Sequence, residues 1–223
     1  MACSDAAGHF IFGNSNFEVI KNGIDTEKFS FNHAYRDEIR REFDIGDRFT
    51  LCHVGMFAPV KNHEFLIDIF ASVVKKHQDS VLLLVGTGSE EEKIREKVSG
   101  LGLSKKVIFA GRRTDVEKIM SAADAFVLPS HFEGLPLVLV EAQSSGLNCF
   151  VSDAVPEEAK LLDNFEFIPL DIGAEAWADR ILSAALNTDR ASASAVVAAA
   201  GYDCKLTAAR IEEIYSQQIA LCL

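Results

Sequence analysis

A chain of 223 residues, 48% hydrophobic and 25% charged, can form one domain with a full core, and this composition excludes a disordered protein. The formal charge of −11 at pH 7 disfavours nucleic acid as a partner, because a phosphate backbone would be repelled overall. The cysteines are odd in number and unclustered, which favours reduced thiols over a disulfide framework or a zinc site: Cys3, Cys52, Cys149, Cys204 and Cys222.

The first elements in chain order are the hardest to place. Residues 1–13 show neither a partner strand nor a helix cap, so they resemble the end of a larger unit. Residues 17–20 predict a first strand, and Asn22-Gly23 predicts a turn after it.

From residue 50 onward, apolar runs of strand length alternate with segments of helical periodicity. Six strands are predicted, at residues 50–56, 81–85, 107–110, 125–128, 149–152 and 165–170. Ser89 and Glu92 have the spacing of a capping box, Asp115 is expected to cap a helix, and Pro136 fits a first helical turn. Residues 191–201 predict a loosely packed helix, and a last helix follows. This alternation predicts an α/β fold with a Rossmann-like, doubly wound parallel sheet.

The loop after the first of these strands combines a glycine, a lysine and a helix start. It contains Gly55 and Lys61, and the helix begins at about Asn62. Ligands of open parallel sheets bind beyond the carboxyl ends of the strands. A diphosphate is held by backbone N–H groups, a helix N-terminus and a cation, so this loop is a candidate diphosphate site. On this loop alone, a solvated Lys61 is an equal alternative.

The loop after the fourth strand contains two glutamates with seven residues between them. Glu133 lies in the loop, whereas Glu141 lies inside a helix that is otherwise apolar from Leu137 to Val140. A carboxylate in such a setting is costly unless it faces a ligand or a partner. Carboxylates accept hydrogen bonds from sugar hydroxyls, so the pair indicates a sugar site. Taken singly, each glutamate is better explained as an exposed acid, Glu133 in a loop and Glu141 on a helix surface, but the two together form a pattern that is much harder to obtain by chance.

These residues resemble a known family, the retaining glycosyltransferases of family four, which have the two-domain GT-B fold. The main mark is the series Pro129-Ser130, Glu133-Gly134-Leu135-Pro136 and Glu141-Ala142. Further marks occur in the family's order: Asn22-Gly23-Ile24-Asp25, Val54-Gly55, Lys61-Asn62, Leu84-Val85-Gly86 with Gly88, and Phe109-Ala110-Gly111. The resemblance implies that residues 17–223 are the nucleotide-sugar-binding C-terminal domain. Residues 1–16 would be a remnant of the N-terminal acceptor domain.

The resemblance also implies roles for individual residues. Lys61 would neutralise the donor diphosphate, Glu133 would contact the transferred sugar, and Glu141 would accept hydrogen bonds from the ribose. Lys61 and Glu133 are therefore the expected catalytic residues. The other residues expected to line the donor site are Gly55, Gly86, Gly88, Arg112, Gly134, Leu135 and Pro136. Met56 departs from the family, because many members have an arginine there; Arg112 or Arg113 could replace it.

The function implied by this resemblance is hexosyl transfer from a UDP-sugar with retained configuration and without a metal or other cofactor. The acceptor would be a carbohydrate or a lipid-linked sugar of bacterial capsule or exopolysaccharide assembly, bound by the N-terminal domain, so the present chain is expected to be inactive alone. We expect a cytoplasmic location, either free or peripheral to the inner face of the membrane. Two alternatives stay open: a UDP-sugar 2-epimerase of the same fold, and a non-catalytic nucleotide-sugar-binding module.

Overall fold

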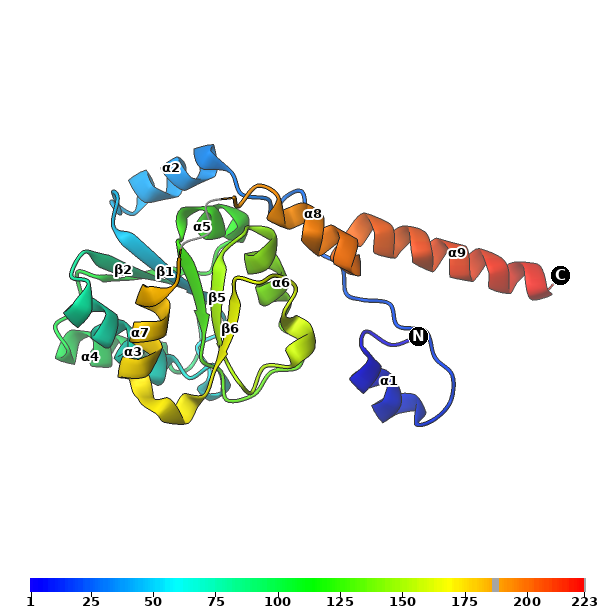
Figure 1. Ribbon diagram of the computed structural model, residues 1–223, viewed down its shortest axis with the longest axis horizontal. Coiled ribbons are helices and arrows are strands. Elements are labelled where there is room, and N and C mark those ends of the chain that lie inside the picture. The colour runs from blue at the N-terminus through cyan, green and yellow to red at the C-terminus, as the bar shows by residue number, and fades with distance from the viewer. Residues whose placement is uncertain (186–188, 223) are drawn as a thin grey trace.

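The fold is built on one sheet of six parallel strands, seen in Figure 1. The computed structural model describes residues 1–185 and 189–222. The strand order is β3-β2-β1-β4-β5-β6. The strands are β1 Phe49–Val54, β2 Ser80–Val85, β3 Val107–Gly111, β4 Ala125–Leu128, β5 Asn148–Ser152 and β6 Phe165–Ile168. Each begins and ends within two residues of its predicted position, and the predicted doubly wound sheet is confirmed.

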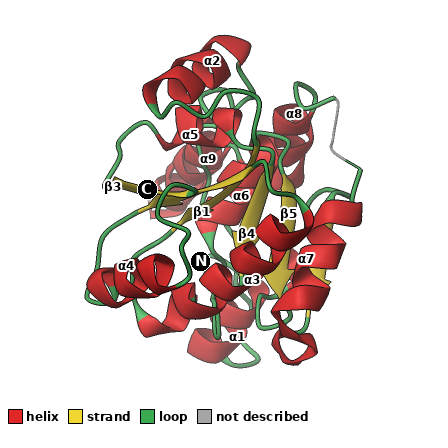
Figure 2. Cartoon of the chain, turned by 90° about the vertical axis from the view of Figure 1, so that its left-hand side faces the viewer, coloured by secondary structure: helices red, strands yellow, loops and turns green. Residues whose placement is uncertain are grey.

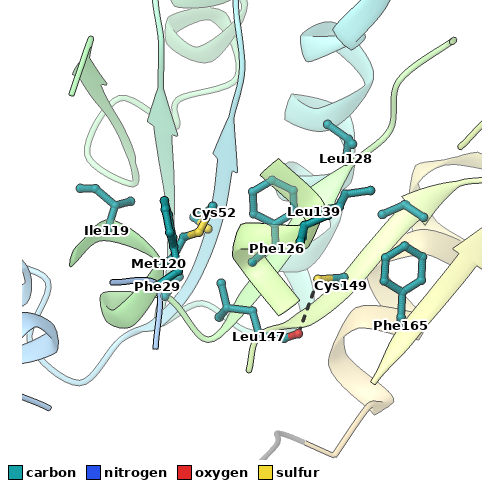
Figure 3. Packing of buried hydrophobic residues seen from close by; sticks show 14 of the residues in the cluster. Phe29, Cys52, Ile119, Met120, Phe126, Leu128, Leu139, Leu147, Cys149 and Phe165 are labelled. Carbon is teal, nitrogen blue, oxygen red and sulfur yellow. Dashed lines mark hydrogen bonds between the residues drawn. The ribbon is translucent and has the colours of Figure 1, made fainter. Parts of the chain in front are cut away.

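Helices cover both faces of the sheet (Figure 2). One face packs against α5 (Val116–Ala122), α6 (Leu137–Ser144) and α8 (Ala193–Val197), and the other against α3 (His63–Lys76), α4 (Glu91–Gly100) and α7 (Gly173–Ser183). Along β2, Leu83 belongs to the first core and Leu82 to the second, as expected for side chains that alternate across a sheet. Figure 3 shows the first core, where Phe126 lies among residues of α5 and α6.

An ion-pair cluster at the amino edge of the sheet fixes α2 (His33–Glu42) to the fold. The Asp124 carboxylate, just before β4, accepts hydrogen bonds from Arg36 at 2.7 Å, Arg40 at 2.9 Å and the backbone N–H of Thr50 at 2.8 Å. Arg40 is 8% exposed and also donates to the carbonyl oxygens of Ala122 and Gly46. Asp124 therefore joins α2, β1 and β4.

The N-terminal residues are ordered, which corrects the prediction that residues 1–13 lack a cap and a partner. The side chain of Ser4 caps helix α1 (Asp5–Phe12), and Ala2 forms a single parallel bridge with Val19. This isolated bridge replaces the strand predicted at residues 17–20. In Figure 1, α1 lies apart from the sheet, on the side toward which α9 (Cys204–Cys222) projects.

Gly23 does not form the predicted turn; its backbone lies against the start of α9 instead. A Cβ atom on Gly23 would lie 2.6 Å from the Cα atom of Cys204, so only glycine allows this approach. The neighbouring Ile24 forms a parallel bridge with Asp203.

Three helix starts differ from the predictions. Helix α4 begins at Glu91 without a side-chain cap, because the Glu90 N–H donates to the carbonyl oxygen of Phe57 and sets where the helix starts. Asp115 precedes α5 but does not cap it, since its carboxylate pairs with Arg113 at 2.8 Å. Pro136 is the residue immediately before α6.

The segment predicted as a loosely packed helix is instead partly buried. Ala193 and Val197 of α8 are buried, and the following π-helical turn η4 (Ala198–Tyr202) ends the segment with Gly201 at a φ of 88°. Short 3-10 turns also occur at η2 (Glu157–Ala159) and η3 (Leu170–Ile172).

Two further expectations concern thiols and membranes. Cys52 and Cys149 are buried free cysteines, and burial raises the pKa of both thiols. Cys3 is exposed, and the side chain of Cys222 lies outside the described residues. Across the described ranges, every helix is too short or too polar to cross a bilayer.

Candidate functional site

The site forms where the order of the strands reverses, between β1 and β4. After β1, the chain makes a 3-10 turn, η1 (Pro59–Lys61), and Asn62 adopts a left-handed conformation at a φ of 55° before α3 begins. After β4, the backbone N–H of His131 donates to the carbonyl oxygen of Val60 at 2.8 Å, which joins the two loops. Ligands of doubly wound sheets bind at this reversal point.

Lys61 and Glu133, both predicted site residues, meet here. Lys61 Nζ donates to Glu133 Oε1 at 2.6 Å, and the two side chains are only 19% and 10% exposed. Solvent screens such a pair less than it screens a surface pair. The structure thus places one cation and one carboxylate together beside the N-terminus of α3.

The predicted glycines hold the surrounding loops close to one another. Gly86 has a φ of 136°, and a Cβ atom there would lie 2.0 Å from the carbonyl oxygen of Gly55. A Cβ atom on Gly88 would lie 2.3 Å from the carbonyl oxygen of Phe57. Backbone hydrogen bonds join the same loops, from the Gly55 N–H to Val85 and from the Phe57 N–H to Thr87. These glycines are therefore required by the packing of the loops.

We expect Gly86→Ala to lower the free energy of unfolding by about 3 kcal/mol or more. An unfavourable backbone conformation contributes about 1–3 kcal/mol, and overpacking against Gly55 contributes about as much again. Urea denaturation measures the change. Gly100→Ala is the matched control, because no atom lies within 4 Å of a Cβ atom at Gly100, and it should be neutral or slightly stabilising. Equal stability of the two variants would contradict the packing argument.

Glu141 is the fifth residue of α6. It is partly buried, and two charged groups act on it, Lys28 and Glu117. Burial raises the pKa of Glu141 to about 7; Lys28 lowers this pKa and Glu117 raises it further. At neutral pH, a group with this pKa is about half ionised.

The remaining predicted residues differ in how accessible they are. Gly134 is exposed, with open space where a side chain would project, so a ligand can approach its backbone. Leu135 packs partly against the core, and Pro136 is buried before α6. Arg112 is exposed.

The structure distinguishes the two arginines that could replace the one absent at Met56. Met56 itself is 63% exposed. Arg113 is occupied, because it binds Glu42 at 2.6 Å and Asp115 at 2.8 Å. Arg112 has no hydrogen bond or ion pair to any residue within 1–185 or 189–222. Arg112 is therefore the arginine available to a ligand.

Buried histidines beneath the loops were not predicted as a group. His53 Nδ1 bonds the carbonyl oxygen of Val127 at 2.8 Å, which agrees with a core histidine, although Nε2 has no partner. His63 is 2% exposed, and the ring of Phe57 stacks on it with the two centroids 4.3 Å apart. Burial lowers the pKa of His53 to about 4 and that of His63 to about 3, so both rings are neutral at pH 7.

A cavity of about 520 Å³ adjoins the site. Its lining includes the two neighbours of Lys61, Val60 and Asn62, together with His131 and residues of α3 and α4. This volume lies within the range of small-molecule sites, roughly 300–1,000 Å³. Within the described part of the chain, histidine, cysteine, aspartate and glutamate form no cluster that could hold a metal ion.

Comparison with known families decides the assignment. The family of glycosyl transferases group 1 matches residues 35–198, which is more than half of the chain. The chain belongs to this family. It is 35% identical, over an alignment of 224 residues, to EpsF of Bacillus subtilis, a protein named as a glycosyltransferase; the alignment covers 96% of this chain and 58% of EpsF.

Solved structures of group 1 glycosyltransferases and related proteins share the fold. Anabaena HepE, solved in complex with UDP and glucose, has a TM-score of 0.79 at 23% identity, covering 96% of this chain and 62% of HepE. The C-terminal domain of the group 1 protein LpcC from Francisella tularensis has a TM-score of 0.67 at 22% identity, covering 82% of this chain and 100% of that domain. The predicted C-terminal GT-B domain is confirmed. The chain spans less than two thirds of the length of EpsF and HepE.

Proposed function

We propose that this group 1 chain binds the nucleotide-sugar donor, a UDP-hexose, of a retaining and metal-independent glycosyl transfer. The observation that carries the proposal is the 2.6 Å contact between Lys61 and Glu133 at the reversal point of the sheet. A nucleotide sugar presents an anionic diphosphate next to a ring of hydroxyls. One cation beside one carboxylate, with a helix N-terminus adjacent, matches both parts of such a ligand.

In this proposal the protein's part is to stabilise the leaving group. The bond between the sugar's anomeric carbon and the diphosphate oxygen breaks, and negative charge grows on the diphosphate. Lys61 and the N-terminal N–H groups of α3 lie where they can stabilise that charge. Glu133, released from Lys61, accepts hydrogen bonds from the sugar hydroxyls. The sugar passes to the acceptor: the acceptor hydroxyl forms the new bond to the same carbon and gives its proton to the oxygen of the departing diphosphate.

The nucleoside half of the donor is assigned to the α5 side of the sheet. Glu141 accepts from the ribose hydroxyls, and the unpaired Arg112 borders the base or replaces the arginine absent at Met56. The backbone at Gly134 is open to the sugar. Gly55, Gly86 and Gly88 act by keeping the loops close enough for these contacts.

Known proteins support a UDP-sugar as the donor. Anabaena HepE has been solved in complex with UDP-glucose. An Escherichia coli relative, 35% identical over 141 residues (60% of this chain and 36% of that protein), is named UDP-Gal:alpha-D-GlcNAc-diphosphoundecaprenol alpha-1,3-galactosyltransferase. By analogy, the acceptor proposed here is a lipid-linked or growing bacterial polysaccharide held by a second domain at the membrane surface. The match to the group 1 glycosyltransferase family favours a glycosyltransferase over a UDP-sugar 2-epimerase.

A non-catalytic binding module is the second candidate, and the observation that favours it is Met56. An exposed methionine at this position removes one charge-assisted contact to the diphosphate, worth about 1.5–3 kcal/mol. Turnover of donor by a two-domain protein that contains this chain would exclude the module.

Nucleotide binding tests the proposal directly. We expect UDP to raise the melting temperature of the chain more than GDP or ADP does, because a ligand of the native state stabilises it. We expect Glu141→Ala to weaken UDP binding about tenfold, as lost ribose hydrogen bonds would. Titration calorimetry measures this loss, with the exposed Glu157→Ala as the control. Unchanged affinity in Glu141→Ala would contradict the ribose assignment, and the absence of any nucleotide shift would contradict donor binding by this chain.

A further inference from the structure

The cavity next to the loop of residues 58–62 contains a buried histidine whose ring nitrogens are both unpaired. His63, the first residue of α3, lines this cavity of about 520 Å³. It is 2% exposed, and no atom within residues 1–185 and 189–222 forms a hydrogen bond with either nitrogen. The ring of His53 meets it edge-on, with the centroids 4.6 Å apart, but does not bond to it. Buried polar atoms are normally paired, so these two nitrogens indicate that the cavity takes a hydrogen-bonding ligand.

The cavity is separate from the proposed donor contacts. Its walls are the loop of residues 58–62, the first turns of α3 and α4, and His131. Val60 and Asn62 line it, whereas Lys61 between them does not, because the Lys61 side chain binds Glu133. Glu133 does not line the cavity either. The loop therefore lies between the cavity and the ion pair, and a ligand can occupy the cavity without displacing the ion pair.

The charges around the cavity nearly cancel. Lys93 contacts the Glu64 carboxylate and lies 3.5 Å from that of Glu90, and all three residues line the cavity. Two carboxylates and one ammonium leave one net negative charge. Helices α3 and α4 both begin here without a side-chain cap, and their N-termini, at about +0.5 each, contribute about one positive charge. The balance is close to zero, which favours a neutral ligand over an anion such as phosphate or a cation.

The neutral ligand must both donate and accept hydrogen bonds. Burial keeps His63 uncharged at pH 7, so one ring nitrogen donates and the other accepts. The side-chain amide of Asn62 does not cap α3, and it offers a donor and an acceptor as well. Pro59 and Ile94 add an apolar wall. A pyranose sugar matches this combination, because its hydroxyls donate and accept while the faces of its ring present C–H groups.

We propose that this cavity binds a neutral hexopyranose unit, as a carbohydrate site separate from the donor site. His63 and Asn62 bind the hydroxyls, and the face of the ring packs on Pro59 and Ile94. The sugar is a unit of a glycan and not the hexose of the donor, because the loop of residues 58–62 separates the cavity from Lys61. This site goes beyond the proposed function and does not depend on nucleotide binding.

Simple glycosides test the site without any nucleotide. The probes are the methyl α-pyranosides of glucose, galactose, mannose and N-acetylglucosamine. We expect at least one of them to shift the imidazole ¹⁵N signals of His63 in a saturable way, with the signals assigned by their loss in His63→Phe. Tetrahydropyran, a ring of the same size without hydroxyls, and inorganic phosphate should leave these signals in place. If no glycoside shifts them, water fills the cavity and the proposal is overturned; a saturable shift with phosphate would identify an anion site and overturn it as well.

Variants of the wall test the hydrogen bonds, with saturation-transfer NMR of the bound glycoside as the measure of affinity. His63→Phe keeps an aromatic ring against Phe57 but removes both nitrogens, so affinity should fall roughly tenfold or more. His33→Phe is the matched control, because His33 is also the first residue of its helix and contacts a phenylalanine ring, but lies outside the cavity. If His63→Phe does not fold, Asn62→Gly supplies the test, since glycine fits the φ of 55° and removes the amide. Unchanged affinity in the folded variant overturns the proposal.

UDP-glucose distinguishes the two possible sources of the sugar. We expect the glycoside to bind with the same affinity when UDP-glucose saturates the chain, because the two sites are separate. Competition by UDP-glucose but not by UDP would place the donor's own hexose in the cavity and overturn the separate site. If UDP-glucose does not bind at all, donor binding fails instead, and the glycoside titration with its variants alone decides the carbohydrate site.

Discussion

Replacing Lys61 by alanine is expected to weaken UDP binding about ten- to a hundredfold and to leave uridine binding nearly unchanged. A hydrogen bond to a charged group contributes roughly 1.5–3 kcal/mol, and uridine has no diphosphate with which to make it. Titration calorimetry with both ligands measures the difference. Lys75→Ala is the control, because Lys75 lies on the same helix α3 but is exposed at its far end.

The comparison of the two ligands gives this experiment its meaning. Removing Lys61 also leaves Glu133, whose side chain is 10% exposed, without its cation, so a general disturbance of the loop is conceivable. Such a disturbance would weaken uridine and UDP binding equally. An equal loss would therefore show that Lys61 does not contact the diphosphate.

Asp124→Ala is expected to lower the free energy of unfolding by about 3–5 kcal/mol, as the loss of one partner of a buried ion pair does. The variant would leave the guanidinium of Arg40, which is 8% exposed, without its carboxylate. It would also remove the acceptor of the Thr50 N–H at the start of β1. Urea denaturation measures the change, and Asp163→Ala serves as an exposed control.

If Asp124→Ala lowered the free energy of unfolding by less than this, other contacts of Arg40 would account for the stability. Arg40 also donates to the carbonyl oxygens of Ala122 and Gly46, at 3.0 and 2.7 Å. If Asp124→Ala lost less than about 1 kcal/mol, these carbonyl bonds would be sufficient to hold the guanidinium, and the ion pair would contribute little.

The sheet could be predicted from the sequence because its strands are buried on both faces. Runs such as Val81–Val85 are then continuously apolar, and their lengths are those of strands. The helix starts were less predictable, because tertiary contacts set them. Just before α4, the Phe57 carbonyl oxygen accepts a hydrogen bond from the Glu90 N–H. Before α5, the Asp115 carboxylate pairs with Arg113 and therefore does not cap the helix.

The residues of the site could be predicted from sheet topology and from the family resemblance, but their contacts could not. Lys61 and Glu133, which are 72 positions apart in the sequence, were both expected to line the donor site, because each follows a strand of one parallel sheet. Their direct contact, however, depends on rotamers and on the bond between His131 and Val60.

The Lys61–Glu133 contact also determines what an approaching nucleotide meets from a distance. In the free chain these two charges cancel, so the loop offers no net positive field, and the chain as a whole carries −11. Long-range attraction therefore cannot draw an anionic ligand to this edge, and association is expected to be slower than in electrostatically steered systems. Recognition here begins only at short range, when a phosphate oxygen exchanges places with the Glu133 carboxylate on the same ammonium group.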